Sequence, residues 1–229
     1  MSPPVGPTGL RMTCTGDASE ASSFAWRAGA AFGFTETALK FGVASGGGDT
    51  TRADFRKTAV LATLERRVAS KWTLSLAVGS TIDGALRIQG AAHDLSAGPL
   101  VALSTSYRAV DEARVTPFVL LTGSLGGSLA WTRERSLVDA PRERMVALDG
   151  RIGVIAGKTV GEILSPYVAA RAFGLPVFWT YRGESVTGTD AFHYQLAAGF
   201  SLRLGRVDVG VEMAPLGERA ITGGAGLAF

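Results

Sequence analysis

Two histidines are the residues best suited to acid–base chemistry in this sequence. His93 stands next to Asp94, and His193 follows Asp190 by three positions. A histidine serves as a general base when it lies within hydrogen-bond distance of the proton it removes and is held there by a partner. The sequence offers no nucleophile at a matching spacing, no metal-ligand cluster and no phosphate-binding loop. We therefore predict a protein that is not an enzyme and holds no metal or cofactor, with a hydrolase as the alternative.

The composition of the 229 residues narrows the class of protein further. Thirty glycines disfavour a helical bundle, and a single cysteine, Cys14, excludes a disulfide scaffold. The charged fraction is 19% and the formal net charge is only +3, which disfavours disorder. Because the cationic residues form no lysine-rich run, we predict no nucleic-acid partner.

Alternation of apolar residues with small or polar ones recurs along the chain and predicts β-strands. In one clear example, Trp72, Leu74, Leu76 and Val78 alternate with threonine, serine, alanine and glycine. The segments with this pattern are Phe24–Phe34, Thr58–Leu64, Trp72–Ile82, Val101–Ala109, Val115–Trp131, Val146–Ala156, Pro166–Ala172 continued as Val177–Tyr181, Phe192–Leu204, Val207–Met213 and Ala220–Phe229. We interpret them as ten strands. A bulge near Gly174 is expected to place Val177, Trp179 and Tyr181 on the apolar face.

The faces opposite the large apolar residues carry small, polar and charged side chains. Such an interior is typical of a transmembrane barrel, whose apolar face meets lipid. The residues that we predict to line this lumen are Arg27, Lys57, Asp149, Arg151, Arg171, His193, Gln195, Asp208 and Glu212.

Aromatic residues cluster near the ends of the predicted strands. If consecutive strands run up and down, these residues form two belts, one at each membrane interface. The predicted belt residues are Trp26, Trp72, Tyr107, Trp131, Trp179, Tyr181, Phe192 and Tyr194.

With these features, the sequence resembles the small bacterial outer-membrane β-barrel proteins from about Ser23 to Phe229. The last residue is Phe229, preceded at alternate positions by Leu227 and Ile221, and this resembles the C-terminal signal that such proteins present to the barrel-assembly machinery. The resemblance implies an all-β, antiparallel, up-and-down transmembrane barrel of about ten strands, or alternatively eight. Residues 1–22 would form a periplasmic extension and residues 23–229 the barrel.

The resemblance also implies a location in the bacterial outer membrane. Met1–Gly9 contains no apolar stretch of signal-peptide length, and we expect that the signal was removed from this sequence. The implied partners are membrane lipid, lipopolysaccharide and the assembly machinery, with the barrel itself a monomer. The arginine-rich loop Arg133–Arg144 would contact the phosphates of lipopolysaccharide.

Four functions remain open from the sequence. We favour a structural barrel or a narrow pore for small solutes, because charged lumen residues pair and fill a small barrel. A surface-binding protein or adhesin is suggested by the long polar loops. A hydrolase at the rim, of the outer-membrane protease or lipid A-modifying type, would use one of the two histidines. A soluble lipocalin-like barrel would share the alternation and differ in being soluble without detergent.

Overall fold

The computed structural model describes residues 25–42, 50–137, 139–174 and 176–229, and all of its regular structure is β-strand. The strands are β1 (Trp26–Gly42), β2 (Thr50–Ala69), β3 (Trp72–Ile88), β4 (Ala91–Leu95), β5 (Gly98–Val110), β6 (Phe118–Glu134), β7 (Glu143–Gly157), β8 (Leu164–Gly174), β9 (Val177–Tyr181), β10 (Glu184–Asp190), β11 (Tyr194–Leu204), β12 (Val207–Gly217) and β13 (Arg219–Ala228). The predicted extension at residues 1–22, Cys14 and Phe24 lie outside the described residues. Within these ranges, no helix is long and apolar enough to cross a membrane.

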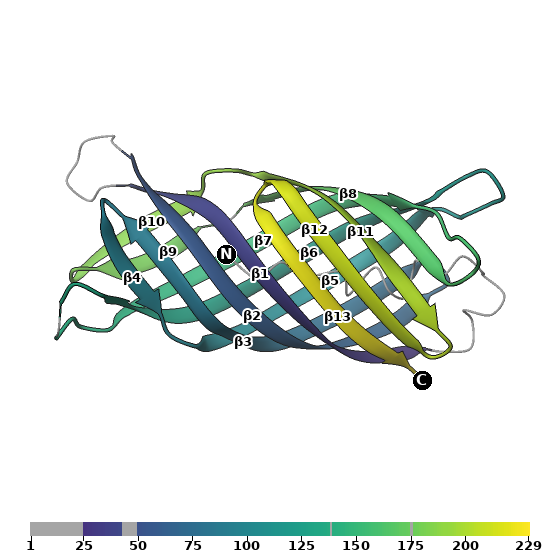
Figure 1. Cartoon of the computed structure of the whole chain (residues 1–229), viewed down its shortest axis with the longest axis horizontal. Coiled ribbons are helices and arrows are strands. Elements are labelled where there is room, and N and C mark those ends of the chain that lie inside the picture. The colour runs from purple at the N-terminus through teal and green to yellow at the C-terminus, as the bar shows by residue number, and fades with distance from the viewer. Residues whose placement is uncertain (1–24, 43–49, 138, 175) are drawn as a thin grey trace.

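Ten tilted antiparallel strands close into a barrel, which we call the wide section (Figure 1). Its order is β1-β2-β3-β5-β6-β7-β8-β11-β12-β13, and β13 pairs with β1 to complete the ring. Closure leaves no strand edge unpaired, so every ladder hydrogen bond is made within the barrel. The prediction of a ten-stranded up-and-down barrel is confirmed.

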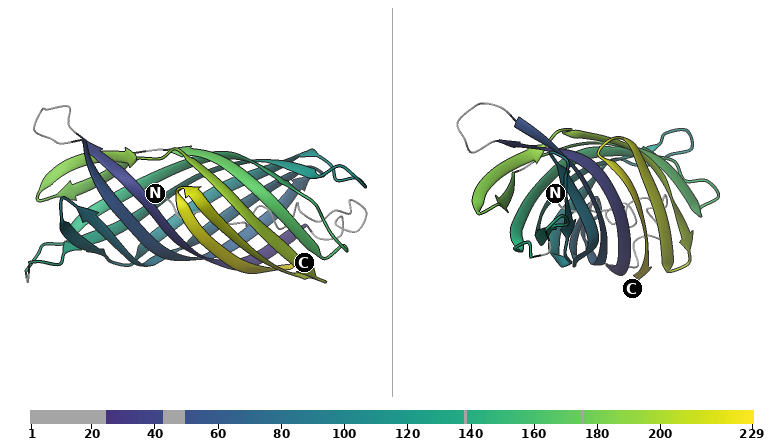
Figure 2. Two further views of the ribbon diagram at one scale, coloured as in Figure 1. Left: turned by 45° about the horizontal axis from the view of Figure 1, so that its top comes forward. Right: turned by 60° about the vertical axis from the view of Figure 1, so that its left-hand side comes forward.

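At the end of the barrel away from the C-terminus, the ring narrows to eight strands, and we call this part the narrow section. Its order is β1-β2-β3-β4-β6-β7-β9-β10, with β10 pairing to β1. Here β4 takes the place of β5, and the β9–β10 hairpin takes the place of β8, β11, β12 and β13, closing the wall beyond their ends between β7 and β1 (Figure 2).

Two tight hairpins build the narrow section, and of their four arms only β9 and the first part of β3 lie in segments that we predicted to be strands. The turns are Gln89-Gly90 between β3 and β4 and Arg182-Gly183 between β9 and β10, and both residues of each turn have a positive φ. This is the geometry of a type I′ turn, whose twist matches that of the flanking strands. Short two-residue turns therefore extend β3 and β9 into paired hairpins.

The outer face of the wide section is apolar all the way around. Each of its ten strands presents an exposed large apolar side chain: Phe32, Val60, Leu76, Leu103, Leu125, Ile152, Val168, Leu196, Val211 and Ile221. Ile152 is 70% exposed. A soluble barrel turns such residues inward, so this arrangement does not favour the lipocalin-like alternative.

The narrow section has the opposite arrangement. Its interior is filled by an apolar cluster of Leu39, Phe41, Ala53, Phe55, Leu86, Ile88, Leu95, Ala130, Met145, Ala147, Val177 and Trp179, with Tyr181 and Val186 packed against it. Its outer face is exposed and charged, and carries Lys40, Arg52, Asp54, Arg56, Arg87, Asp94, Arg133 and Arg144. We refer to the apolar cluster as the plug.

The plug corrects our prediction for Trp179 and Tyr181. Both belong to the interior of the narrow section, and Trp179 is only 1% exposed. The expected bulge near Gly174 is absent, because the pairing of Gly150 with Gly174 continues in the same register as Ala147 with Val177. The sides of the strand therefore do not switch; instead, the interior changes from polar to apolar.

Candidate functional site

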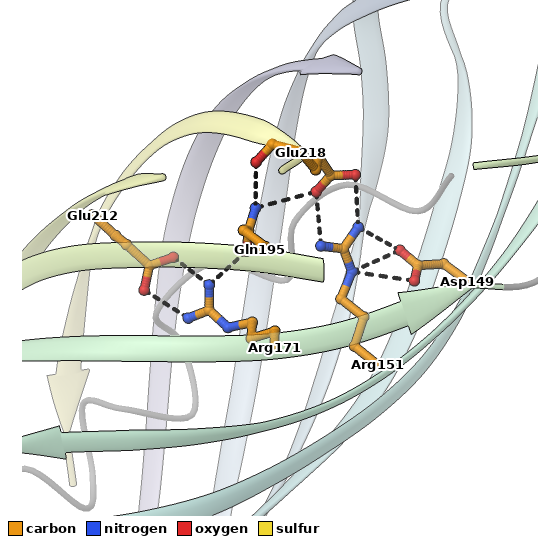
Figure 3. Close-up of polar contacts among 6 residues, drawn as sticks. All are labelled: Asp149, Arg151, Arg171, Gln195, Glu212 and Glu218. Atoms are coloured by element: carbon orange, nitrogen blue, oxygen red, sulfur yellow. Dashed lines mark hydrogen bonds and ion pairs between the residues drawn. The ribbon is translucent and has the colours of Figure 1, made fainter. Parts of the chain in front are cut away.

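Arg151 is the centre of a buried polar network inside the wide section (Figure 3). Its guanidinium donates from Nε to Asp149 Oδ2 at 2.8 Å and from Nη1 to Glu218 Oε1 at 2.7 Å. Asp149 and Arg151 are two positions apart in β7 and so share its inner face, whereas Glu218 lies between β12 and β13 across the barrel. One arginine thus joins opposite walls through two carboxylates.

Gln195 extends this network to a second arginine. Its Nε2 donates to Glu218 Oε1 at 3.3 Å, and its Oε1 accepts from Arg171 Nη1 at 2.8 Å. Arg171 in turn donates two parallel hydrogen bonds of 2.6 Å each to the two carboxylate oxygens of Glu212. Such fork-to-fork pairing fixes both side chains in direction as well as in distance.

Tyr167 completes the network, and a glycine makes room for it. The Tyr167 hydroxyl donates to Glu212 Oε2 at 3.2 Å. A Cβ atom on Gly199, in the neighbouring strand β11, would lie 2.6 Å from that hydroxyl oxygen. Glycine at position 199 is therefore required for the tyrosine ring to reach the carboxylate.

A separate charged cluster lies in the wide section at the end that holds the C-terminus. Arg27 pairs closely with Asp208 and has Glu65 Oε2 3.8 Å away, and Arg203 lies 3.8 Å from the other oxygen of Asp208. Arg27 and Asp208 are the second residues of β1 and β12, which meet across β13 at this end. All three members of the Arg27–Glu65–Asp208 group are at most 3% exposed.

Lys57 adds a third cation to the larger network. It lies within electrostatic reach of Glu218, Asp149 and buried Asp190, and its ammonium also approaches the Phe55 ring to 5.9 Å. Lys57, Arg151 and Arg171 thus face four carboxylates, those of Asp149, Asp190, Glu212 and Glu218. A buried network of this kind resists losing one member, because the remaining charge would have no partner.

Most of the predicted lumen residues lie where we expected them. Arg27, Lys57, Asp149, Arg151, Gln195, Asp208 and Glu212 are buried inside the wide section, and the Arg171 side chain is 10% exposed. Glu218 was missed, although it is 1% exposed and holds Arg151. It follows the strand β12 in a one-residue connection, so no alternating pattern marks its direction.

His193 is the exception among the predicted lumen residues. It is exposed, precedes β11, and places its Nδ1 atom 3.3 Å from the carbonyl oxygen of Phe173. Residues 191–193 belong to no strand, so the alternation that we extended back from Gln195 stops at Tyr194. The ring lies at the end of a groove on the outer face of the wide section.

The His93–Asp94 pair, a candidate for the alternative hydrolase, does not form. His93 is 1% exposed and packs edge-on against Trp179 and Tyr181, whereas Asp94 points to the outer face and pairs with Arg135. Burial lowers the pKa of His93, and the hydrogen bond from Arg135 lowers the pKa of Asp94. Neighbours in a strand point to opposite faces, which separates the two side chains.

The remaining predicted belt residues lie on the outer face. Trp72 and Tyr107 pair across β3 and β5 with their rings 4.9 Å apart, near the end that holds the C-terminus. Phe192 and Tyr194 lie 6.4 Å apart at the other end of the wide section. Trp26 lies under the Arg66 guanidinium, and Trp131 is half-buried on the outer face of the narrow section. Ile221, Leu227 and Phe229 are exposed along and beyond β13.

Comparison with solved structures identifies the architecture. The structure is similar to the outer membrane protease OmpT from Escherichia coli, with a TM-score of 0.56 and 11% identity over 90% of this chain and 97% of that one. It also resembles the translocator domain of the autotransporter NalP from Neisseria meningitidis, with a TM-score of 0.51 and 12% identity over 96% and 94% of the two chains. The chain has the fold of an outer-membrane β-barrel.

A third neighbour points to the same fold. The β domain of the Bordetella autotransporter BrkA gives a TM-score of 0.51 and 13% identity over 89% of this chain and 99% of that one. At such low identity the outer-membrane barrel fold is shared by proteins with different activities, a protease and two autotransporter units. The sequence matches no family model and no curated protein.

Proposed function

We propose that this chain is an integral, non-enzymatic protein of the bacterial outer membrane whose barrel is closed at its outer end. The observation that carries the proposal is the contrast between the two sections: the wide section is apolar outside and holds the charged networks inside beside two smaller apolar clusters, whereas the narrow section is charged outside and apolar inside. The wide section then spans the lipid and the narrow section stands in water beyond it. The short connections and the C-terminus face the periplasm.

The plug supports the closed state. Trp179 donates from its indole nitrogen to the Thr132 hydroxyl oxygen at 2.8 Å and packs against Phe41 at 5.4 Å between ring centroids. Phe55 lies in the same cluster and is 2% exposed. Packed aromatic rings of this kind form a hydrophobic constriction, which closes a pore by excluding water.

Two measurements test the proposal. The protein should float with phospholipid vesicles and run differently on a denaturing gel when unboiled; a protein that stays soluble without detergent would overturn the membrane assignment. In planar bilayers, wild type should show no steady conductance, whereas Trp179→Ala should open brief channels. Trp131→Ala removes an indole from the outer face of the same section and should stay closed. Steady conductance by wild type would overturn the closed state.

A non-enzymatic role is supported by the separation of His93 from Asp94 and of buried Asp190 from exposed His193. We expect His93→Ala and His193→Ala to leave protease and lipase assays on intact cells unchanged. A loss of hydrolysis with either variant would revive the rim hydrolase.

Two partners belong to this proposal. Arg133 and Arg144 are exposed on the narrow section and suit phosphate groups of lipopolysaccharide, so the double change to serine should lower lipopolysaccharide retained on purification. Phe229, exposed beyond β13, would be recognised by the assembly machinery. Phe229→Ser should therefore lower the fraction of folded barrel in the membrane. Unchanged retention or assembly would remove the corresponding partner.

A further inference from the structure

His93 joins the two hairpins that build the narrow section. It belongs to β4 in the first hairpin, and its ring packs edge-on against Trp179 and Tyr181 of β9 in the second, with ring centroids 5.3 and 5.7 Å apart. The strands β6 and β7 separate β4 from β9 in the sheet, so this contact crosses the interior of the barrel. The three rings therefore hold the hairpins together inside the plug.

The His93 ring is buried against these aromatic rings. It is 1% exposed, and neither of its nitrogens has a hydrogen-bond partner within the part of the chain that the structure describes. An imidazolium carries a full charge and two N–H donors, so an apolar site disfavours it more than the neutral ring. A proton taken up by His93 would therefore weaken the contact between the hairpins.

Three charged groups face His93, and other partners hold them. Glu134, its cross-strand neighbour in β6, accepts from the Ser136 hydroxyl at 2.6 Å and lies 3.6 Å from the Arg182 guanidinium. Glu143 of β7 accepts a hydrogen bond from the backbone N–H of Arg182. The Arg182 guanidinium also lies 5.2 Å from the centroid of the Tyr181 ring, which already has this cation beside it. Burial outweighs the two carboxylates, and the pKa of His93 is lowered.

We propose that acid opens the outer end of the barrel by protonating His93, which separates the β3–β4 hairpin from the β9–β10 hairpin. The inference rests on the proposed closed barrel, whose narrow section stands in the water that delivers the proton. Once separated, His93 would titrate at its ordinary pKa of about 6.5. Between that value and the lower pKa in the plug, only the separated state binds the proton, so the closed state loses stability as pH falls.

Spin labels on the two hairpins measure their separation directly. Gln89 and Ser185 are exposed, one on each hairpin, and both are changed to cysteine in a Cys14→Ser background, which leaves no other cysteine. His93→Phe keeps a ring in the contact but does not titrate, and His93→Leu is a second apolar replacement. His193→Ala is the matched control, because it removes the other histidine, which is exposed on the wide section. Distances are recorded by pulsed electron resonance in phospholipid vesicles from pH 7.5 to pH 4.5.

We expect a single short distance in every protein at pH 7.5. With His93 present, in the labelled parent and in His193→Ala, a longer distance should appear below about pH 6.5 and grow by up to about tenfold per pH unit, the limit for one proton. His93→Phe and His93→Leu should keep the short distance throughout. Asp190 is unchanged in all of these proteins, so its own protonation does not account for the difference.

Two results would overturn this inference alone: a parent whose distance does not respond to pH, or a response that persists in His93→Phe and His93→Leu. Loss of the response in His193→Ala would also overturn it, by assigning the effect to the other histidine. Steady conductance of wild type at pH 7.5 would instead overturn the closed barrel on which the inference rests. Gel mobility of unboiled samples shows that each variant is folded.

Discussion

The wide and narrow sections share the strands β1, β2, β3, β6 and β7, but the polarity of their inner and outer faces is reversed. In β2, Val60 and Leu64 face outward in the wide section with Lys57 and Glu65 inside, whereas Arg52 faces outward at the other end of the strand. In β2 the alternation keeps its phase between these levels, whereas β3 is interrupted by a bulge near Ile82. On the proposed membrane insertion, the surrounding medium changes: lipid favours apolar side chains outside, and water favours them inside.

This contrast explains why the barrel can be both filled and membrane-embedded. The narrow section is stabilised like a soluble protein, by burying Trp179, Phe55 and their neighbours. The wide section has smaller apolar clusters, one of them around Phe118 and Leu120, and at Arg151 its opposite walls are joined by paired charges. Substitutions in the two sections should therefore change the free energy of unfolding by different amounts. The expected effects follow from the largest to the smallest.

The largest effect is expected for Arg151→Met in the wide section. The change leaves Asp149 and Glu218 buried beside each other without their shared cation, which costs about 3–5 kcal/mol of unfolding free energy. Urea unfolding in lipid vesicles, followed by gel mobility, measures it. The double variant with Glu218→Gln should recover part of the loss; a single variant as stable as wild type would show that the network does not hold the walls together.

Val60→Arg tests the polarity of the outer face. A cation near the middle of the lipid-facing belt costs about 2–4 kcal/mol in a membrane barrel. The exposed position Arg52, in the same strand beyond the belt, should accept Arg52→Leu with little change in the same unfolding assay. If the two substitutions lower the free energy of unfolding by the same amount, the lipid-facing belt does not end between Val60 and Arg52.

Asp190→Asn tests the junction of the two sections through pH. Burial raises the pKa of Asp190 in β10 to about 6, whereas an unfolded aspartate titrates near 3.9. Between these values the folded state keeps a proton that the unfolded state has lost, so stability falls as pH rises. The variant should match wild type below about pH 4 and gain up to about 3 kcal/mol above pH 7. A gain that is independent of pH would contradict the shift.

The smallest effect is expected for Arg135→Ala on the narrow section. Its ion pair with Asp94 is on the outer face, with both side chains more than half exposed, and water screens such pairs. Stability should be nearly unchanged, in contrast to the buried pair of Arg151. A loss comparable to that of Arg151→Met would mean that the charged outer face carries part of the stability.

Much of the wide section could be predicted from the sequence because period-two alternation is a local property. It indicated ten strands, and it placed Arg27, Asp149 and Glu212 on the inner faces. It missed Glu218, which lies between strands, and it misplaced His193, where the strand had already ended. Gly90 and Gly183 could have indicated the two hairpin turns of the narrow section. The strands that flank these turns are short, however, and the sequence around them is polar.

By itself, the sequence determined which residues share a face, because the strand geometry alone places alternate side chains together. It also determined that one face would be small and polar over most of the chain. Only the tertiary structure decided which face is inside at each level, since that depends on where the ring narrows from ten strands to eight. Trp179 and Tyr181 show the difference. The sequence showed that they share one face of a strand, but their place in the plug follows from the strands that close around them.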